Sequence, residues 1–233
     1  MKCYMKDLGI RRWTGIIGIG ISLLTMIELR LYFVYDGPPP VSNILTRILV
    51  DLLLCLGYLA FIVGLRQLIL DASPDHEWVG RLCYTSGLVY VTLTLVADSI
   101  QVGSVLGSHG EIDPTTIGAG GEGALLVFGP IGRLLMALFL ITAGAAILGT
   151  DLLPKWTAWV ALTVAVFQLA LVPSIFSGTD PSHFYSINGW GVAVAGALFM
   201  LWILTVSIVM LRRKDGSLDQ RISQNWDAAS EQK

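Results

Sequence analysis

The run "ILTRILVDLLLCLGYLAFIVGLR" (residues 44–66) is strongly apolar, and its only charged residues are Arg47, Asp51 and Arg66. At 1.5 Å per residue a helix of this run is about 34 Å long, enough to cross the roughly 30 Å hydrocarbon core of a bilayer. In lipid a segment must pair its own backbone hydrogen-bonding groups, which favours a helix. The run therefore predicts a helix that spans a membrane.

Apolar runs of similar length recur along the chain. They lie at residues 13–35, 80–103, 129–149, 155–173 and 188–211. Hydrophobic residues make up 54% of the chain and charged residues only 14%, whereas about a quarter of the residues are charged in soluble domains. We therefore predict an all-α, polytopic membrane protein with a six-helix transmembrane domain over residues 13–211.

Lysine and arginine residues gather on one side of the predicted spans. If the amino terminus is cytoplasmic, 12 of the 15 fall on the cytoplasmic side: Lys2, Lys6, Arg11, Arg12, Arg66, Arg81, Lys155, Arg212, Arg213, Lys214, Arg221 and Lys233. The other three, Arg30, Arg47 and Arg133, lie within spans or at their edges. The positive-inside bias then predicts that both termini face the cytoplasm, and we expect the cell inner (plasma) membrane.

Two tails flank the predicted spans. Residues 1–12 are expected to form a basic cytoplasmic tail. Residues 212–233 are polar and expected to be disordered, and their basic start can contact anionic lipid.

The outer loop at residues 104–128 is glycine-rich and then apolar up to Gly129-Pro130. A single helix over 118–149 would be about 48 Å long, more than the bilayer needs, so we expect a break at Pro130. Two arrangements are open: the piece before Pro130 is interfacial or re-entrant, or the fourth helix is bent and projects into water.

Ionisable and amide side chains in the spans form the candidate ligand-binding site. Its residues are Glu28, Arg47, Asp51, Asp98, Gln101 and Arg133. Given the topology above, all of them fall in the outward halves of their helices. Glu28 and Arg30 are two residues apart and point to different faces, so Glu28 needs a partner on another helix, or a proton. We predict that these side chains, with Arg30, Gln168 and Asn188, meet in an outward-facing polar pocket beneath the loop 104–128.

Three functions are compatible with this pattern. Intramembrane ionisable residues usually mark a functional site, so the favoured one is a non-enzymatic protein that binds or passes a small or amphipathic ligand. Three acids and three guanidiniums also balance as an interhelical ion-pair network would, which suggests an accessory subunit of a membrane complex. The third is an intramembrane enzyme that uses a carboxylate as general base on a lipid-like substrate.

Other chemistries have little support. No basic groove with interleaved aromatic residues indicates nucleic-acid binding. The three histidines, His76, His109 and His183, are expected in loops and not on helices where they could ligate haem, and "HGEID" (109–113) is better explained as a solvated loop than as a cation site. The three cysteines show neither CxxC spacing nor an even count. We expect no cofactor, no metal site and no catalytic residue; the bilayer, a ligand and other membrane proteins are the expected partners.

Glycine and tryptophan positions fit a membrane bundle. The glycines of "GIIGIGIS" (15–22) and "NGWGVAVAG" (188–196) are expected to permit close helix packing. Five tryptophans fit aromatic belts at the membrane interfaces: Trp13, Trp78, Trp156, Trp159 and Trp190.

Two segments, together about half of the chain, carry a family pattern. They are "RILVDLLLCLGYLAFIVGL" (47–65) and "LFLITAGAAILGTDLLPKWTAWVALTVAV" (138–166), in which a small-residue stretch, the short loop around Leu153-Pro154-Lys155-Trp156 and the next span follow one another. In these features the chain resembles a family of uncharacterised bacterial six-helix membrane proteins. The resemblance implies that fold and a bacterial inner membrane and carries over no catalytic residue, whereas the loop 104–128 departs from the family pattern.

Overall fold

The computed structural model describes residues 2–32, 34, 40–107, 119–150, 152–180 and 182–212. The predicted disordered tail therefore lies almost wholly outside the described residues. So does the middle of the loop 104–128, with His109, Glu111 and Asp113.

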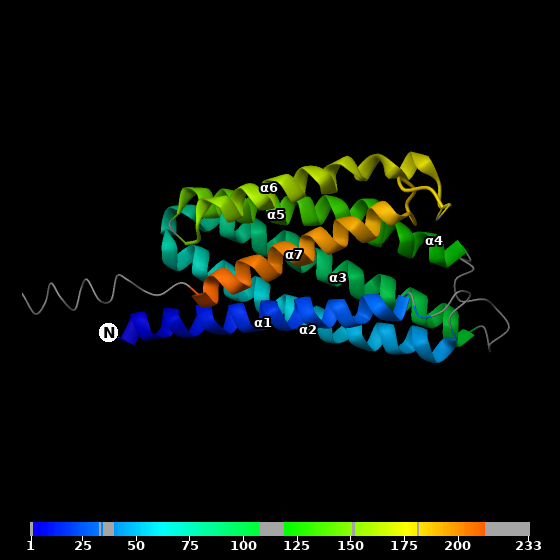
Figure 1. Ribbon diagram of the computed structural model, residues 1–233, viewed down its shortest axis with the longest axis horizontal. Helices are drawn as coiled ribbons and strands as arrows, with labels where there is room; N and C mark the ends of the chain where they lie inside the picture. The colour runs from blue at the N-terminus through cyan, green and yellow to red at the C-terminus, as the bar shows by residue number, and fades with distance from the viewer. Residues whose placement is uncertain are drawn as a thin grey trace, which may run out of the picture.

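Among the described residues every regular element is helical (Figure 1). The α-helices are α1 (Lys2–Tyr32), α2 (Val41–Ala72), α3 (Glu77–Gly107), α4 (Ala119–Leu126), α5 (Gly132–Gly149), α6 (Lys155–Ala170) and α7 (Trp190–Arg212). Short 3₁₀ turns lie at η1 (Pro74–His76) and η3 (Val172–Ser177), and η2 (Val127–Ile131) is π-helical. Six helical stretches are long and apolar enough to cross a membrane, which confirms the six predicted spans.

The helices extend beyond the apolar runs from which they were predicted. The second span ends at Ala72 instead of Arg66, because residues 66–72 are mostly good helix formers and no proline follows until Pro74. In the same way α1 begins at Lys2, so residues 2–12 of the predicted tail are helical. Apolar composition marks the part that fits in lipid, whereas breaking residues mark where a helix ends.

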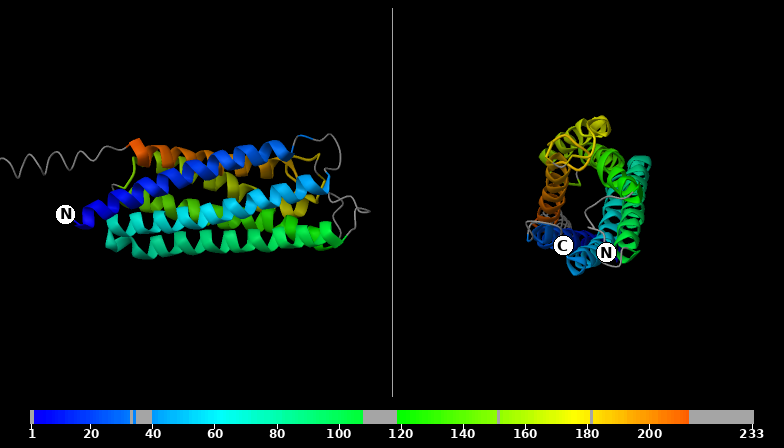
Figure 2. Two further views of the ribbon diagram at one scale, coloured as in Figure 1. Left: turned by 90° about the horizontal axis from the view of Figure 1, so that it is seen from below. Right: turned by 90° about the vertical axis from the view of Figure 1, so that its right-hand side faces the viewer.

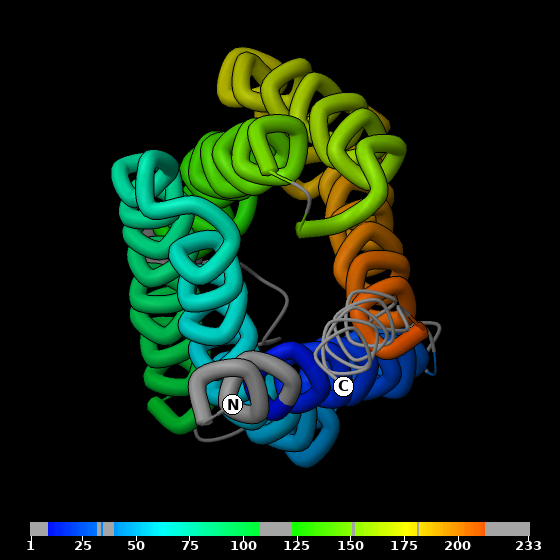
Figure 3. The backbone as a smooth tube through the Cα atoms, turned by 90° about the vertical axis from the view of Figure 1, so that its left-hand side faces the viewer, coloured from blue at the N-terminus to red at the C-terminus, as the bar shows by residue number. Residues whose placement is uncertain are grey.

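The helices form a closed ring in chain order. Contacts join α1 to α2, α2 to α3, α3 to α5, α5 to α6, α6 to α7, and α7 back to α1, and Figure 3 shows the ring end-on. Short connections make successive helices antiparallel neighbours. We call the end that carries the N-terminus, the α2–α3 and α5–α6 connections and Arg212 the near end; the opposite end, where α1 leads to α2, is the far end (Figures 1 and 2).

The outer surface of the ring is apolar. Large side chains such as Leu56 and Val166 are mostly exposed on it, as a lipid-facing surface requires. The five tryptophans expected in aromatic belts are all exposed, whereas Trp202 is buried in the ring.

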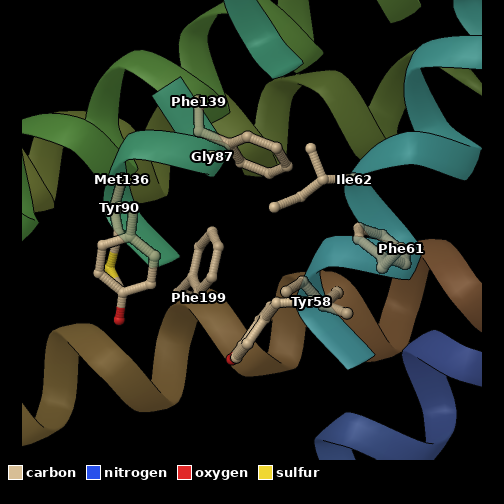
Figure 4. A pocket seen from close by; sticks show the side chains of 9 residues that line it. Tyr58, Phe61, Ile62, Gly87, Tyr90, Met136, Phe139 and Phe199 are labelled. Atoms are coloured by element: carbon tan, nitrogen blue, oxygen red, sulfur yellow. The ribbon is translucent and has the colours of Figure 1, made fainter. Parts of the chain in front are cut away.

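Side chains fill the space that the ring encloses. Phe199 stacks on Tyr58, with ring centroids 6.4 Å apart, and meets Phe139 edge-on at 5.9 Å. Trp202 contacts both phenylalanines. A cavity of about 10 Å³ remains beside these rings (Figure 4), room for about one water molecule. The aromatic core therefore closes the middle of the ring.

Glycines let α1 approach its neighbours closely, as predicted for "GIIGIGIS". A Cβ added at Gly18 would overlap the Ser207 hydroxyl oxygen on α7, whereas Gly20, on the same helix, has no atom within 4 Å of that position. The "NGWGVAVAG" glycines differ from this expectation. Gly189 and Gly191 lie against backbone carbonyls of the turn before α7, and Gly196 faces open space.

Replacing Gly18 with alanine is expected to destabilise the protein by about 1–3 kcal/mol, because the extra methyl group must displace the Ser207 hydroxyl and crowds the Phe61 ring, whose nearest atom lies 3.0 Å from the added Cβ. The matched control is Gly20→Ala. It is expected to be neutral or to stabilise by up to about 1 kcal/mol, since alanine favours a helix and meets no neighbour. Thermal unfolding of the purified protein in detergent measures both changes, and equal effects at the two positions would contradict the packing described here.

The chain is distorted at Gly129-Pro130. Gly129 adopts non-helical angles (φ −81°, ψ −115°), and Pro130 lacks the N–H that a regular helix would use there. Figure 1 shows α4, η2 and α5 following one another in the same direction along the bundle. Over residues 119–149 the chain is thus a distorted helix that does not double back, and 108–118 lie outside the described residues.

Candidate functional site

Three acidic side chains from three neighbouring helices meet inside the ring, toward the far end. Glu28 of α1 and Asp98 of α3 are 7% and 2% exposed, and Asp51 of α2 is half-buried. The carboxyl groups of Glu28 and Asp51 lie within hydrogen-bonding reach of each other. Asp98 interacts electrostatically with Asp51. We call these three residues the acidic cluster.

Helical spacing explains how the sequence builds this cluster. Asp51, Cys55 and Tyr58 are spaced by four and three residues, so they lie on one face of α2. The Cys55 thiol is close enough to interact with all three carboxyl groups of the acidic cluster. On α3, Asp98 lies one turn from Thr94 on the buried face. Two faces selected by 3.6-residue periodicity thus point at each other across the α2–α3 contact.

Asp98 is the most unusual residue of the cluster. Both of its carboxylate oxygens are buried, and neither has a hydrogen-bond partner among the described residues. A buried polar group without a partner is costly, and more so when it is charged. Such a group in a folded protein calls for an explanation, such as a ligand or an unseen water.

The other predicted site residues lie at varying distances from the acidic cluster. Arg47 is buried one turn from Asp51 and interacts with it electrostatically. Gln101 is half-buried on α3, three residues beyond Asp98. Arg30 is exposed, so the structure does not bring it into the predicted pocket; two positions from Glu28, it points to a different face of α1. Asn188 is exposed in the turn before α7, so the structure does not bring it into the pocket; the span predicted from residue 188 begins as a helix only at Trp190.

Arg133 belongs to a second buried polar group. Its guanidinium donates to Gln168 Oε1 and to the Phe128 carbonyl oxygen, both at 3.2 Å. Gln168 is fully buried, and its amide donates to the Ala195 carbonyl oxygen at 2.8 Å. These bonds join η2, α5, α6 and α7. We call Arg133 and Gln168 the polar lock.

The π-helical segment accounts for one bond of the polar lock. The Gly132 N–H points to the carbonyls of Val127 and Gly129, not to Phe128, which a regular α-helix would pair with residue 132. The Phe128 carbonyl is thereby left for the Arg133 guanidinium. The Arg133 bonds to Gln168 and Phe128 hold helical elements together.

Two exposed salt bridges show how acids at the surface are paired. Arg81 pairs with Glu77 at 2.5 Å, and His183 with Asp180 at 3.5 Å. The backbone N–H and the hydroxyl of Ser182 donate to Asp180 Oδ1 at 2.9 and 2.8 Å. These bonds, helped by His183, hold the pKa of Asp180 below its usual value. Asp98, by contrast, lies in the interior with no hydrogen-bond donor among the described residues.

Comparison with known proteins adds no further assignment. No protein-family model, no curated protein and no solved structure matches this chain. In the described part of the chain no three His, Cys, Asp or Glu side chains are grouped so that they could hold a metal ion. The chemistry of the acidic cluster itself must therefore carry the functional assignment.

Proposed function

We propose that this chain is a bacterial inner-membrane protein, with cytoplasmic termini, that binds or passes a small ligand through its polar interior. The six membrane-capable helices support a multi-pass membrane location. The excess of lysine and arginine on one side of the spans supports the orientation. With cytoplasmic termini the acidic cluster lies toward the outer face.

The buried carboxylate of Asp98 is the observation that carries this proposal. It stands beside Asp51, another acid, and its two oxygens have no hydrogen-bond donor among the described residues. Natural proteins keep such costly groups mainly where function needs them. A residue retained only for helix packing would be expected to have a partner, as Gln168 has.

The composition of the acidic cluster suggests the charge of the ligand. Asp51 interacts with both Glu28 and Asp98. Such neighbouring acids favour a positively charged ligand, including a proton, because a cation relieves the repulsion between them. Glu28 and Asp98 are buried, and Asp51 is half-buried. A ligand that reaches Asp98 would therefore enter after the helices around the far end separate.

The structural alternative draws on a different part of the molecule. The polar lock ties four elements together through three hydrogen bonds, as an accessory subunit held by interhelical contacts would require, although the buried Arg133 Nε has no hydrogen-bond partner among the described residues. It does not account for Asp98, which takes part in none of those bonds.

Cys55 provides a native reporter for this proposal, because it lies within reach of the acidic cluster. In a Cys3→Ala background we expect a cationic thiol reagent, trimethylammonioethyl methanethiosulfonate, to label Cys55 at least about tenfold faster than the anionic sulfonatoethyl reagent. Both rates are normalised to the reaction with free glutathione. Mass spectrometry of protein in native membranes locates the label.

Cys83 is the internal control. Both cysteines are buried, but Cys83 contacts the Phe139 carbonyl on the near side of the aromatic core, away from the acidic cluster. Neither reagent should therefore label Cys83 before the protein unfolds, whereas Cys55 reacts whenever the acidic cluster opens to the reagent. Equal normalised rates at Cys55, or labelling of Cys55 only after unfolding, would count against an accessible acidic site and favour the structural alternative.

A further inference from the structure

A groove lies on the outer surface at the near end, between the start of α6 and the end of α7. Its volume is about 480 Å³, and it opens to the outside of the ring. Its lining residues are Pro154, Trp156, Thr205, Ile208, Val209 and Arg212. This volume falls within the range of small-molecule binding sites.

The groove is apolar along its length and basic at its end. Ile208 and Val209 are half-buried along one wall, and Trp156 is 51% exposed at the mouth. Arg212, the last residue of α7, is exposed at the same level as Lys155, the first residue of α6. Two cations thus stand where two membrane-capable helices end.

The groove is separate from the ligand site proposed above. Between the groove and the interior of the ring, the buried Trp202 indole N–H donates to the Thr157 carbonyl oxygen at 3.1 Å. This bond joins α7 to α6. The acidic cluster lies toward the opposite end of the bundle. Occupation of the groove therefore does not depend on the proposed function.

We propose that this groove binds an anionic phospholipid, with an acyl chain along Ile208 and Val209 and the phosphate against Arg212. A guanidinium matches phosphate oxygens in bidentate geometry, and tryptophan prefers the headgroup level that the rim occupies. Charge complementarity selects the lipid. A net negative headgroup is attracted by Arg212, the basic residue that lines the groove, whereas the choline of a zwitterionic lipid is repelled by it.

The probe is phosphatidylglycerol with brominated acyl chains, which quench nearby tryptophan fluorescence. The full chain is reconstituted in phosphatidylcholine vesicles that contain brominated phosphatidylglycerol or, in parallel, brominated phosphatidylcholine as a minor component. The difference between the wild type and Trp156→Phe isolates the Trp156 signal. We expect about fivefold enrichment of phosphatidylglycerol over phosphatidylcholine at Trp156, the factor given by about 1 kcal/mol for one basic residue, Arg212.

Two variants make this test specific. Arg212→Gln should abolish the preference, whereas Arg81→Gln, at an exposed near-end arginine outside the groove, should leave it unchanged. Trp78, exposed at the same end of the bundle, should be quenched equally by the two brominated lipids. Equal quenching of Trp156 by both lipids in the wild type, or a preference that survives in Arg212→Gln, would overturn the proposal.

Discussion

Replacing Gln168 with leucine is expected to lower the free energy of unfolding by about 3–5 kcal/mol. The reason is that the buried Arg133 guanidinium loses the hydrogen bond that it donates to Gln168 Oε1. The Gln168 amide also donates to the Ala195 carbonyl, which the leucine leaves unsatisfied. At about 2–4 °C per kcal/mol for a protein of this size, thermal unfolding in detergent resolves the loss clearly.

The double variant Arg133→Met with Gln168→Leu separates packing from charge. Since it removes the buried cation together with its partner, it is expected to be more stable than Gln168→Leu alone. Gln67→Leu is the matched control: the Gln67 amide donates to Asp71 at the surface, so its loss should change stability by no more than about 0.5 kcal/mol. Additive losses in the double variant would mean that Arg133 and Gln168 do not act as one unit.

Much of the fold and part of the site could be predicted from local patterns. Apolar length identified six spans, and the spacing of Asp51, Cys55 and Tyr58 identified one helix face. Antiparallel topology then placed Glu28, Asp51 and Asp98 in corresponding halves of their helices, and the structure brings these three acids together. Their role in ligand binding stays a prediction.

The polar lock shows what local patterns miss. Gln168 and Arg133 are 35 residues apart on different helices, and their meeting depends on the rotation of each helix. It also depends on the shift at η2 that exposes the Phe128 carbonyl. A proline in the sequence indicates a kink, but not which carbonyl the kink releases or which side chain takes it.

Asn188 illustrates a second limit, at helix boundaries. The apolar residues that follow Asn188 predict that it belongs to the last span, yet the helix begins at Trp190 after a turn. The turn is held by backbone bonds such as Gly191 N–H to the Phe184 carbonyl. Such bonds depend on a tight local conformation that apolar periodicity does not register.

Replacing Asp98 with leucine is expected to raise the free energy of unfolding, whereas Gln168→Leu is expected to lower it. Leucine matches the branched shape of aspartate and removes two buried oxygens that lack hydrogen-bond partners among the described residues. Exchanging buried charged groups for apolar groups of similar shape often stabilises a protein by about 1–4 kcal/mol. We expect a gain in this range, together with a smaller charge preference in Cys55 labelling, because Asp98 is one of the three acids that interact with Cys55.

An exposed acid provides the control for this substitution. Asp71 lies at the near end of α2 and bonds to Gln67 at the surface. Asp71→Leu should change stability by no more than about 0.5 kcal/mol and leave Cys55 labelling unaltered. A gain confined to Asp98 would show that this buried carboxylate is retained at a cost to stability, as functional residues often are.

The most direct test of the acidic cluster as a ligand site is the sign of the change in unfolding free energy on Asp98→Leu, measured by thermal unfolding of purified protein in detergent. A rise of about 1–4 kcal/mol is the predicted result. A fall of several kcal/mol, comparable to that of Gln168→Leu, would contradict it and make Asp98 a structural member of the bundle.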